Sequence, residues 1–154
     1  MATPVNIDEL AQEMQSGFEI MVTFLHLESG SIVMIQEEIF RQAADEEPVE
    51  ELEDWEQIEY RAAQDILLHP DHYIEFPDRD EINEYRMMER FCLSLEEGRA
   101  RDRLLSAIRG KGAFSRFKDG VMSIGMNDEW QSFRTECYRE FAKKWCEMNG
   151  IPYE

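Results

Sequence analysis

The sequence is poor in cysteine and in long apolar runs, and each shortage excludes a class of protein. Its three cysteines, Cys92, Cys137 and Cys146, are an odd number without C-x-x-C spacing, which argues against a disulfide framework or a zinc site and favours buried, reduced thiols. No apolar run approaches the roughly 18 residues that a membrane helix needs, and the first ten residues do not resemble a signal peptide. We therefore expect a cytoplasmic protein with no membrane contact.

Basic residues are also scarce. Lys and Arg number 16 against 34 Asp and Glu, so the formal net charge is -18, which repels nucleic acid at long range and favours basic partners. The hydrophobic content of 43% nevertheless supplies a core, and 154 residues fall within the usual size of one domain. We expect a single domain over residues 1–154.

The first half, residues 1–77, has the patterns of a helix and a β-hairpin. Asn6 is a good N-cap for a helix that ends at Gly17, and Glu9 completes a start like a capping box. The apolar stripe of this helix is Ile7, Leu10, Ala11 and Met14. Residues 18–27 and 31–35 are rich in aromatic and β-branched residues and flank a turn at Gly30, which predicts a hairpin. Apolar residues on both faces of the first strand predict cover on both sides.

An acidic block, residues 45–59, follows the hairpin, and its first half is expected to be solvated. The alternatives are that the block mimics phosphates or binds a divalent cation, but no EF-hand-like order of ligands is present. A helix with the stripe Trp55, Ile58, Ala62 and Ile66 is predicted next, ending before Pro70. Residues 72–77 are expected to form a short third strand.

The second half, residues 78–154, is predicted to be helical. Four apolar stripes recur at helical spacing: Ile82, Tyr85, Met88, Phe91 and Leu95; Leu104, Leu105 and Ile108; Phe114, Phe117, Val121 and Ile124; and Trp130, Phe133, Cys137, Phe141, Trp145 and Met148. The fold class predicted is α+β: an N-terminal helix and β-hairpin or small antiparallel sheet joined to a C-terminal helical bundle.

One segment reverses the charge of its surroundings. Residues 99–118, RARDRLLSAIRGKGAFSRFK, hold seven basic residues and one acidic residue. Two glycines there would let backbone N–H groups approach a ligand ahead of a helix N-terminus. The candidate anion-binding residues are Arg109, Gly110, Lys111, Gly112, Arg116 and Lys118.

The alternative is a structural corner between two helices. Gly110 and Gly112 would then reverse the chain, Phe114 and Phe117 would enter the core, and the cations would pair with Asp and Glu. A corner of this kind also suggests a DNA-reading motif, but the second helix offers few polar side chains and the net charge opposes duplex DNA. A weaker basic surface, Arg134, Arg139, Lys143 and Lys144, could extend an anion groove.

No sequence motif identifies a catalytic centre. A Walker loop and a G-x-S-x-G motif are both absent, and His69 and His72 are more ordinary as loop residues than as metal ligands. Glu84, Glu89 and Glu129 are only nominal acid or base candidates. We predict no metal and no cofactor, and the pattern leaves enzymatic activity open while favouring a non-enzymatic protein.

The segment GKGAFSRFKD, residues 110–119, resembles the signature GxGAFxRFKD of a bacterial family of uncharacterised, UPF-type proteins. The segments at residues 24–35, 72–77, 84–91 and 129–151 also resemble this family, in the same order and spacing. Ser31 departs from the family, which more often has an acidic residue there, and the first helix is only loosely similar. The resemblance implies one shared architecture and no catalytic residues, cofactor or substrate.

Taken together, these patterns predict a cytoplasmic binding or regulatory protein that acts through protein–protein contacts. The alternative is a nucleotide- or RNA-binding protein that uses the basic segment.

Overall fold

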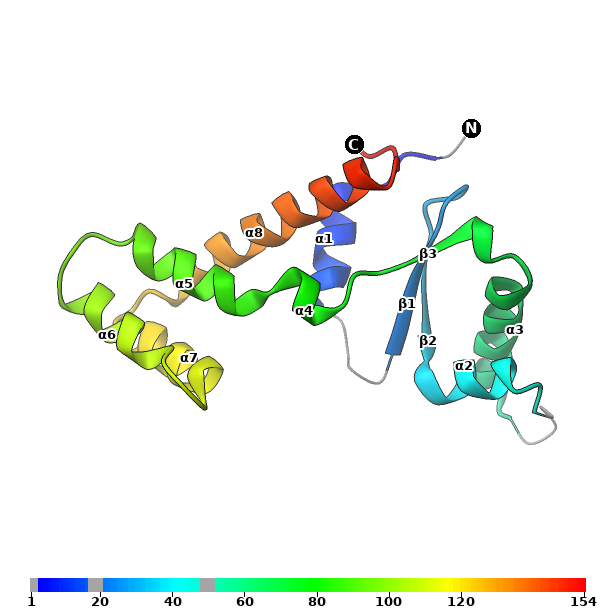
Figure 1. Ribbon diagram of the computed structural model, residues 1–154, viewed down its shortest axis with the longest axis horizontal. Coiled ribbons are helices and arrows are strands. Elements are labelled where there is room, and N and C mark those ends of the chain that lie inside the picture. Colours follow the sequence, from blue (N-terminus) through cyan, green and yellow to red (C-terminus); the bar gives the residue numbers. More distant parts are fainter. Residues whose placement is uncertain (1–2, 17–20, 48–51) are drawn as a thin grey trace. The chain divides into compact units, whose positions relative to one another are not determined.

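The computed structural model describes residues 3–16, 21–47 and 52–154. The chain forms two compact units: unit 1 comprises residues 1–76 and 142–154, and unit 2 comprises residues 77–141. A small antiparallel sheet near the N-terminus is followed by helices toward the C-terminus, so the predicted α+β class is confirmed (Figure 1). The single domain stays a prediction.

Unit 1 opens with the predicted helix. In α1, Ile7–Ser16, the stripe Ile7, Leu10, Ala11 and Met14 is buried. The side-chain oxygen of Asn6 accepts the backbone N–H of Glu9 at 3.0 Å, which is the expected N-cap. The predicted end at Gly17 lies outside the described residues.

Three strands form the sheet of unit 1, in the order β2-β1-β3. They are β1, Met21–His26, β2, Ile32–Gln36, and β3, Tyr73–Glu75, and both neighbours pair antiparallel to β1. In this register Phe24 lies opposite Val33 on one side and Glu75 on the other. The hairpin and the third strand are therefore confirmed, although residues 18–20 of the expected first strand lie outside the described residues.

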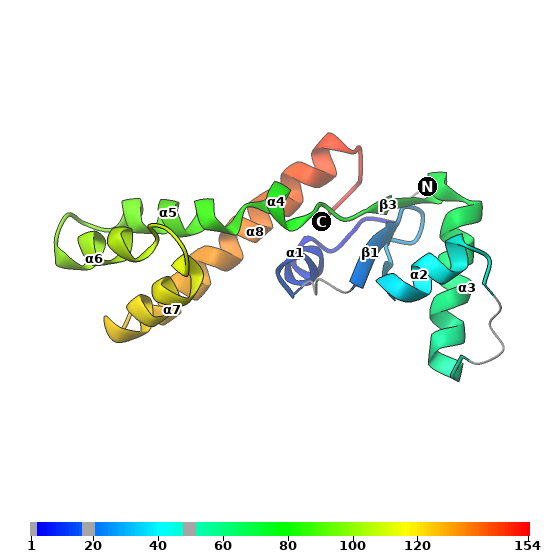
Figure 2. The same cartoon turned by 60° about the horizontal axis from the view of Figure 1, so that its bottom comes forward.

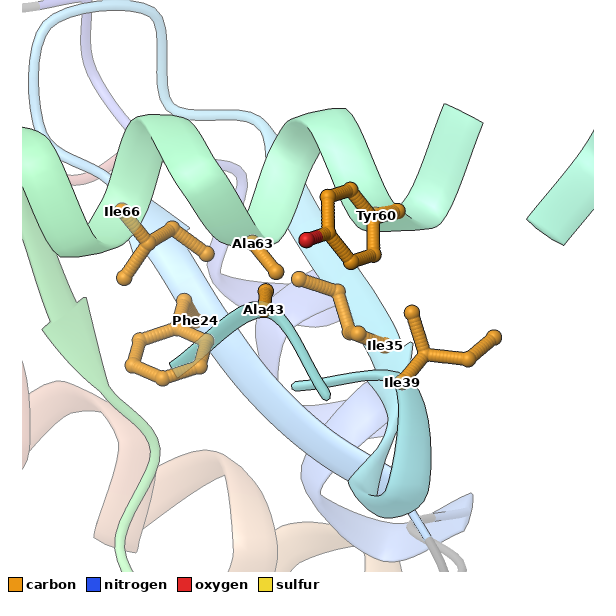
Figure 3. Close-up of a cluster of buried hydrophobic side chains, with 7 residues drawn as sticks. All are labelled: Phe24, Ile35, Ile39, Ala43, Tyr60, Ala63 and Ile66. Atoms are coloured by element: carbon orange, nitrogen blue, oxygen red, sulfur yellow. The ribbon is translucent and has the colours of Figure 1, made fainter. Parts of the chain in front are cut away.

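Both faces of β1 are covered, as predicted. Phe24 and Leu25 point to opposite faces and are only 8% and 0% exposed. On one face, α2, Glu37–Ala44, and α3, Asp54–Leu68, enclose a cluster of apolar side chains (Figure 3). Its members are Phe24, Ile35, Ile39, Ala43, Tyr60, Ala63 and Ile66. On the other face lies α1, as both ribbon views show (Figures 1 and 2).

The two helices over this cluster were the least predictable part of unit 1. No helix was predicted at α2. The helix predicted before Pro70 is confirmed as α3, but of its predicted stripe only Ile66 is buried, since Trp55 and Ile58 are 49% and 68% exposed. Beside Ile66 the helix buries Tyr60 and Ala63, which were not in the predicted stripe. Ala63 is fully buried against the sheet, and the Tyr60 hydroxyl can be buried because it donates to the carbonyl of Glu47 at 2.8 Å. After α3 a short 3-10 turn, η1, Pro70–His72, leads into β3.

Unit 2 consists of helices. They are α4, Arg79–Ile82, α5, Glu84–Ser94, α6, Arg99–Ala107, α7, Ala113–Ser123, and the first part of α8, Asn127–Met148, which continues into unit 1. The single stripe predicted from Ile82 to Leu95 is broken, because Asn83 takes a left-handed conformation with φ +55° and caps α5 by accepting the N–H of Arg86 at 3.2 Å. Leu104, Phe117 and Trp130 are buried as predicted.

Aromatic side chains dominate the core of unit 2. Phe91 of α5 meets Phe117 of α7 and Trp130 and Phe133 of α8 edge to face, with ring centroids 6.2, 5.4 and 5.4 Å apart. Phe117 also contacts Trp130 at 4.7 Å. The core therefore holds α5, α7 and the first turns of α8 together, and it fixes which face of α7 points inward.

Candidate functional site

The basic segment forms a corner between two helices. Residues 99–118, named here the basic corner, comprise α6, a turn and the first half of α7. Gly110 and Gly112 take left-handed conformations, with φ +74° and +78°, which glycine adopts without steric cost. The turn that sequence analysis proposed is therefore present at these two glycines.

Arg116 holds the turn closed. Its guanidinium donates Nε–H to the carbonyl of Ala107 at 3.0 Å, and Nη1 and Nη2 donate to the carbonyls of Lys111 and Arg109. These oxygens lie where α6 ends and the turn begins, so they have no helical partner of their own. Arg116 thus serves the corner as an internal cap, and only part of its donor capacity remains for an anion.

Gly112 makes room for this arrangement. A Cβ atom built at residue 112 would lie 3.0 Å from Nη1 of Arg116, closer than nearly all such contacts, and the backbone is already left-handed. A Cβ at Gly110 would meet nothing within 4 Å. Of the two glycines, Gly112 is therefore the one that the Arg116 contact requires.

Five of the other six cations of the corner are exposed to solvent. Arg99, Arg103, Arg109, Lys111 and Lys118 are exposed, and Arg101 is half-buried. Among the described residues, none of the corner's seven basic side chains forms an ion pair. The alternative in which these cations pair with Asp and Glu is therefore not seen in the described part of the chain.

Phe114 corrects the sequence analysis. It was predicted to enter the core with Phe117, but its side chain is 56% exposed while Phe117 is 1% exposed. Because Phe114 precedes Phe117 by three residues, the two side chains lie about 60° apart around the helix axis. Phe114 is therefore at the edge of the apolar stripe, where side-chain spacing alone does not decide whether a residue is buried. The structure thus adds an exposed aromatic ring to the corner.

The second basic surface is partly used for contacts within the protein. Arg134, at 21% side-chain exposure, pairs with Glu84 through Nε at 2.5 Å, and its guanidinium stacks over the Tyr138 ring at 5.3 Å. The Tyr138 hydroxyl donates to the other carboxylate oxygen of Glu84 at 3.0 Å. Lys143 and Lys144 belong to unit 1, whereas Arg134 and Arg139 belong to unit 2.

This triad ties α5 to α8 and leaves Glu84 engaged. Burial and the charge of Glu84 raise the pKa of the Tyr138 phenol to about 12. Burial lowers the pKa of the Arg134 guanidinium, but the Glu84 hydrogen bond and charge outweigh it, so that pKa is raised. With their pKa values raised, the Tyr138 phenol stays protonated and the Arg134 guanidinium stays charged at neutral pH, which suits a structural tie better than proton transfer.

The cysteines are buried, as predicted. Burial raises the pKa of the Cys92 and Cys146 thiols to about 11, and it raises that of Cys137 as well. Since the thiolate is the nucleophilic form, these cysteines are poor candidates for covalent chemistry at neutral pH.

The two loop histidines stack on each other. The rings of His69 and His72 are 4.9 Å apart and 11° from parallel, and both are exposed. Within residues 3–16, 21–47 and 52–154, no three His, Cys, Asp or Glu side chains gather closely enough to hold a metal ion. No described helix combines the length and the apolarity needed to cross a membrane.

Several carboxylates of the acidic block have local roles. Arg41 pairs with Asp45 at 3.2 Å and with Glu47 at 3.4 Å, at the end of α2. Glu53 and Glu56 form a capping box at the start of α3. Residues 48–51 of the block lie outside the described part of the chain, so the prediction of a solvated first half stays untested there.

Comparison with known proteins places the chain in a family without assigning it an activity. No curated protein and no solved structure matches it. A family model, described as the uncharacterised protein family UPF0158, matches residues 4–153, which is nearly the whole chain, and the chain belongs to that family.

Proposed function

We propose that this UPF0158 protein is a non-enzymatic binding or regulatory protein whose contact surface is the basic corner, and that the corner docks an acidic segment of a partner protein. The observation behind this proposal is the set of corner cations that have no ion pair among the described residues. Exposed cations without carboxylate partners keep their hydration and their full attraction for an incoming anion.

The distribution of charge supports the same surface. Unit 1 contains 21 acidic and 4 basic residues, a net charge of -17, and unit 2 contains 13 acidic and 12 basic residues, a net charge of -1; together these make -18. Within unit 2 the corner alone has a net charge of +6, from seven basic residues and one acidic residue. Because exposed charges are screened beyond about 8 Å at physiological ionic strength, a ligand at the corner responds mainly to the corner.

Engaged side chains support a non-enzymatic role. Glu84, a nominal acid or base, already accepts hydrogen bonds from Arg134 and Tyr138, and the three thiols are buried with raised pKa values. Glu89 and Glu129 are exposed. The proposal also includes a bacterial source, a cytoplasmic location and the interpretation of residues 110–119 as a family signature.

The exposed ring of Phe114 favours a second candidate, a nucleotide- or RNA-binding protein. Single-stranded RNA is recognised by cations that neutralise phosphates and by aromatic rings that stack on bases, and Phe114 lies between Lys111 and Lys118 in the sequence. Duplex DNA fits less well, because α7 offers few polar side chains for reading a groove.

The experiment is a binding titration with simple anionic probes. Fluorescently labelled poly-glutamate, an oligouridine RNA and ATP are titrated with the purified protein at salt concentrations from about 50 to 200 mM. We expect poly-glutamate to bind with an affinity that falls as salt rises, and Lys111→Ala with Lys118→Ala to weaken it about three- to tenfold, as for two exposed ion pairs.

A matched control removes two exposed cations outside the corner. Arg61→Ala with Arg86→Ala deletes the same charge outside the corner and should leave probe affinity nearly unchanged. Binding of RNA or ATP alone, lost in the corner variant, would favour the second candidate. Equal losses in both variants, or no binding of any probe, would reject the corner as the contact surface.

A further inference from the structure

The outer face of α7 has an unpacked row of side chains. Phe114, Lys118 and Met122 follow one another at four-residue intervals, and all three are exposed, Phe114 to 56% and Met122 to 59%. Side chains at i, i+4 and i+8 form one of the ridges by which helices pack against each other. This row, named here the outer ridge, extends about 12 Å along the helix axis at 1.5 Å per residue.

The opposite face of α7 is fully used. Ala113, Phe117, Gly120 and Val121 are buried. A Cβ atom at Gly120 would lie 2.9 Å from Cδ2 of Leu104, so α6 packs closely against α7 at that point. Because this inner contact fixes the rotation of α7, the apolar side chains of the outer ridge are held outward.

The segment that contains the outer ridge has a net positive charge. Lys118 lies at the centre of the ridge, and Arg109 and Lys111 precede its first residue across the turn; Asp119 is the only acidic residue between positions 103 and 127. Cationic side chains flanking two exposed apolar ones complement a surface that is acidic and partly apolar. An RNA backbone would complement the cations and one ring but would leave Met122 without a role.

We infer that the outer ridge docks an acidic amphipathic helix of a partner protein, in an inference that rests on the proposed function. The partner's apolar stripe packs on Phe114 and Met122, and its carboxylates face Lys118 and the two cations of the turn. Ridge-into-groove packing sets the orientation, and the charges select an acidic helix over a basic one. The inference thus narrows the partner from any acidic segment to an acidic amphipathic helix.

Two synthetic peptides test the inference. Both contain the same Glu, Leu and Ala residues, but in one the Leu residues lie on one helical face and in the other they are scattered. We expect the intact chain to bind the amphipathic peptide about tenfold more tightly than the scattered one, as when one side-chain contact is added. Phe114→Ser with Met122→Ser should abolish this preference and leave the weaker binding of the scattered peptide in place.

A matched control changes two exposed apolar residues elsewhere. Leu68→Ser with Met148→Ser, at 74% and 86% exposure in unit 1, should retain the preference. All four changed side chains are exposed, so each variant is expected to fold, which its thermal unfolding curve checks.

The outcomes separate the two proposals. Equal binding of both peptides would reject the amphipathic helix and leave the basic corner as a binding surface. Binding of neither peptide would reject the proposed function itself. RNA binding that depends on Phe114 without peptide binding, or concentration-dependent self-association that Phe114→Ser with Met122→Ser abolishes, would overturn the inference in favour of RNA or a second copy of the chain.

Discussion

The two units differ in the way they use charge and apolar surface. Unit 1 has a net charge of -17 and a core of aliphatic and aromatic side chains between a sheet and helices, whereas unit 2 has a net charge of -1 and a core of clustered aromatic rings. Described carboxylates of unit 1 cap helices and pair locally, while the cations of the basic corner in unit 2 do neither, apart from Arg116. Charges without a local structural role are the ones available to a partner.

The largest expected effect breaks the aromatic core of unit 2. Phe117→Ala should reduce the free energy of unfolding by about 3–5 kcal/mol, because it leaves a cavity beside Phe91 and Trp130. Phe114→Ala, three residues away on the same helix, should change it by less than about 1 kcal/mol because that ring is exposed. Denaturant unfolding compares the two, and similar losses would contradict the assignment of Phe114 to the surface.

A smaller effect is expected at the turn of the basic corner. Arg116→Ala removes three hydrogen bonds to backbone carbonyls, and with allowance for its exposure it should reduce stability by about 1–2 kcal/mol. Arg116→Lys keeps the charge but not the three-way geometry, so it should recover only part of the loss. Full recovery by lysine in chemical unfolding experiments would mean that charge, rather than the carbonyl contacts, is what the corner needs.

Each unit has a tyrosine hydrogen-bonded to a carboxylate, and an alkaline titration tests both contacts. Burial and a neighbouring carboxylate, Asp65 for Tyr73 and Glu84 for Tyr138, raise both pKa values to about 12. Since each folded pKa exceeds the unfolded value near 10, the phenols hold protons that the unfolded chain releases, so stability is retained below pH 10 and falls between about pH 10 and 12.

Removing one phenol at a time measures each contribution. Tyr138→Phe should reduce stability at neutral pH by about 1 kcal/mol, the value of one hydrogen bond, and flatten part of the alkaline loss. Tyr73→Phe is the matched variant of unit 1. Phenolate absorbance followed against pH gives the two pKa values, and titration of both groups near pH 10 would contradict the two carboxylate contacts.

The smallest effect is expected from the free cations. Lys118→Ala and Arg109→Ala should each change the free energy of unfolding by no more than about 0.5 kcal/mol, because neither side chain forms an ion pair among the described residues. Salt-dependent thermal unfolding provides the measurement. A clear loss of stability in either variant would show that the corner cations serve the fold, which would blur the contrast between the units.

Much of the fold could be predicted where a sequence pattern was compatible with only one local structure. The cap and stripe of α1, the hairpin around Gly30 and the helix break at Gly110 all follow from local chemistry. The α2 helix escaped prediction because its eight residues hold only Ile39 and Ala43 as buried positions, too few for a recognisable stripe. The break at Asn83 escaped because the apolar spacing continues across it.

The candidate site divides in the same way. The basic corner, its glycines and its charge could be predicted because they are properties of consecutive residues. The role of Arg116 could not, since three carbonyls from the end of α6 and the turn meet its guanidinium only when the chain reverses. The sequence signal that could have suggested it is a pair of glycines, Gly110 and Gly112, with an arginine four residues after the second.

The sequence by itself determined which residues form most helices and strands and where the charge reverses, because capping, periodicity and composition act within a few neighbouring residues. Tertiary structure decided which face of a helix is buried where two faces compete. In α3, Tyr60 and Ala63 are buried rather than Trp55 and Ile58, and in α7 Phe117 is buried whereas Phe114 is exposed. These choices depend on the shape and polarity of what lies opposite, which side-chain spacing along one helix does not contain.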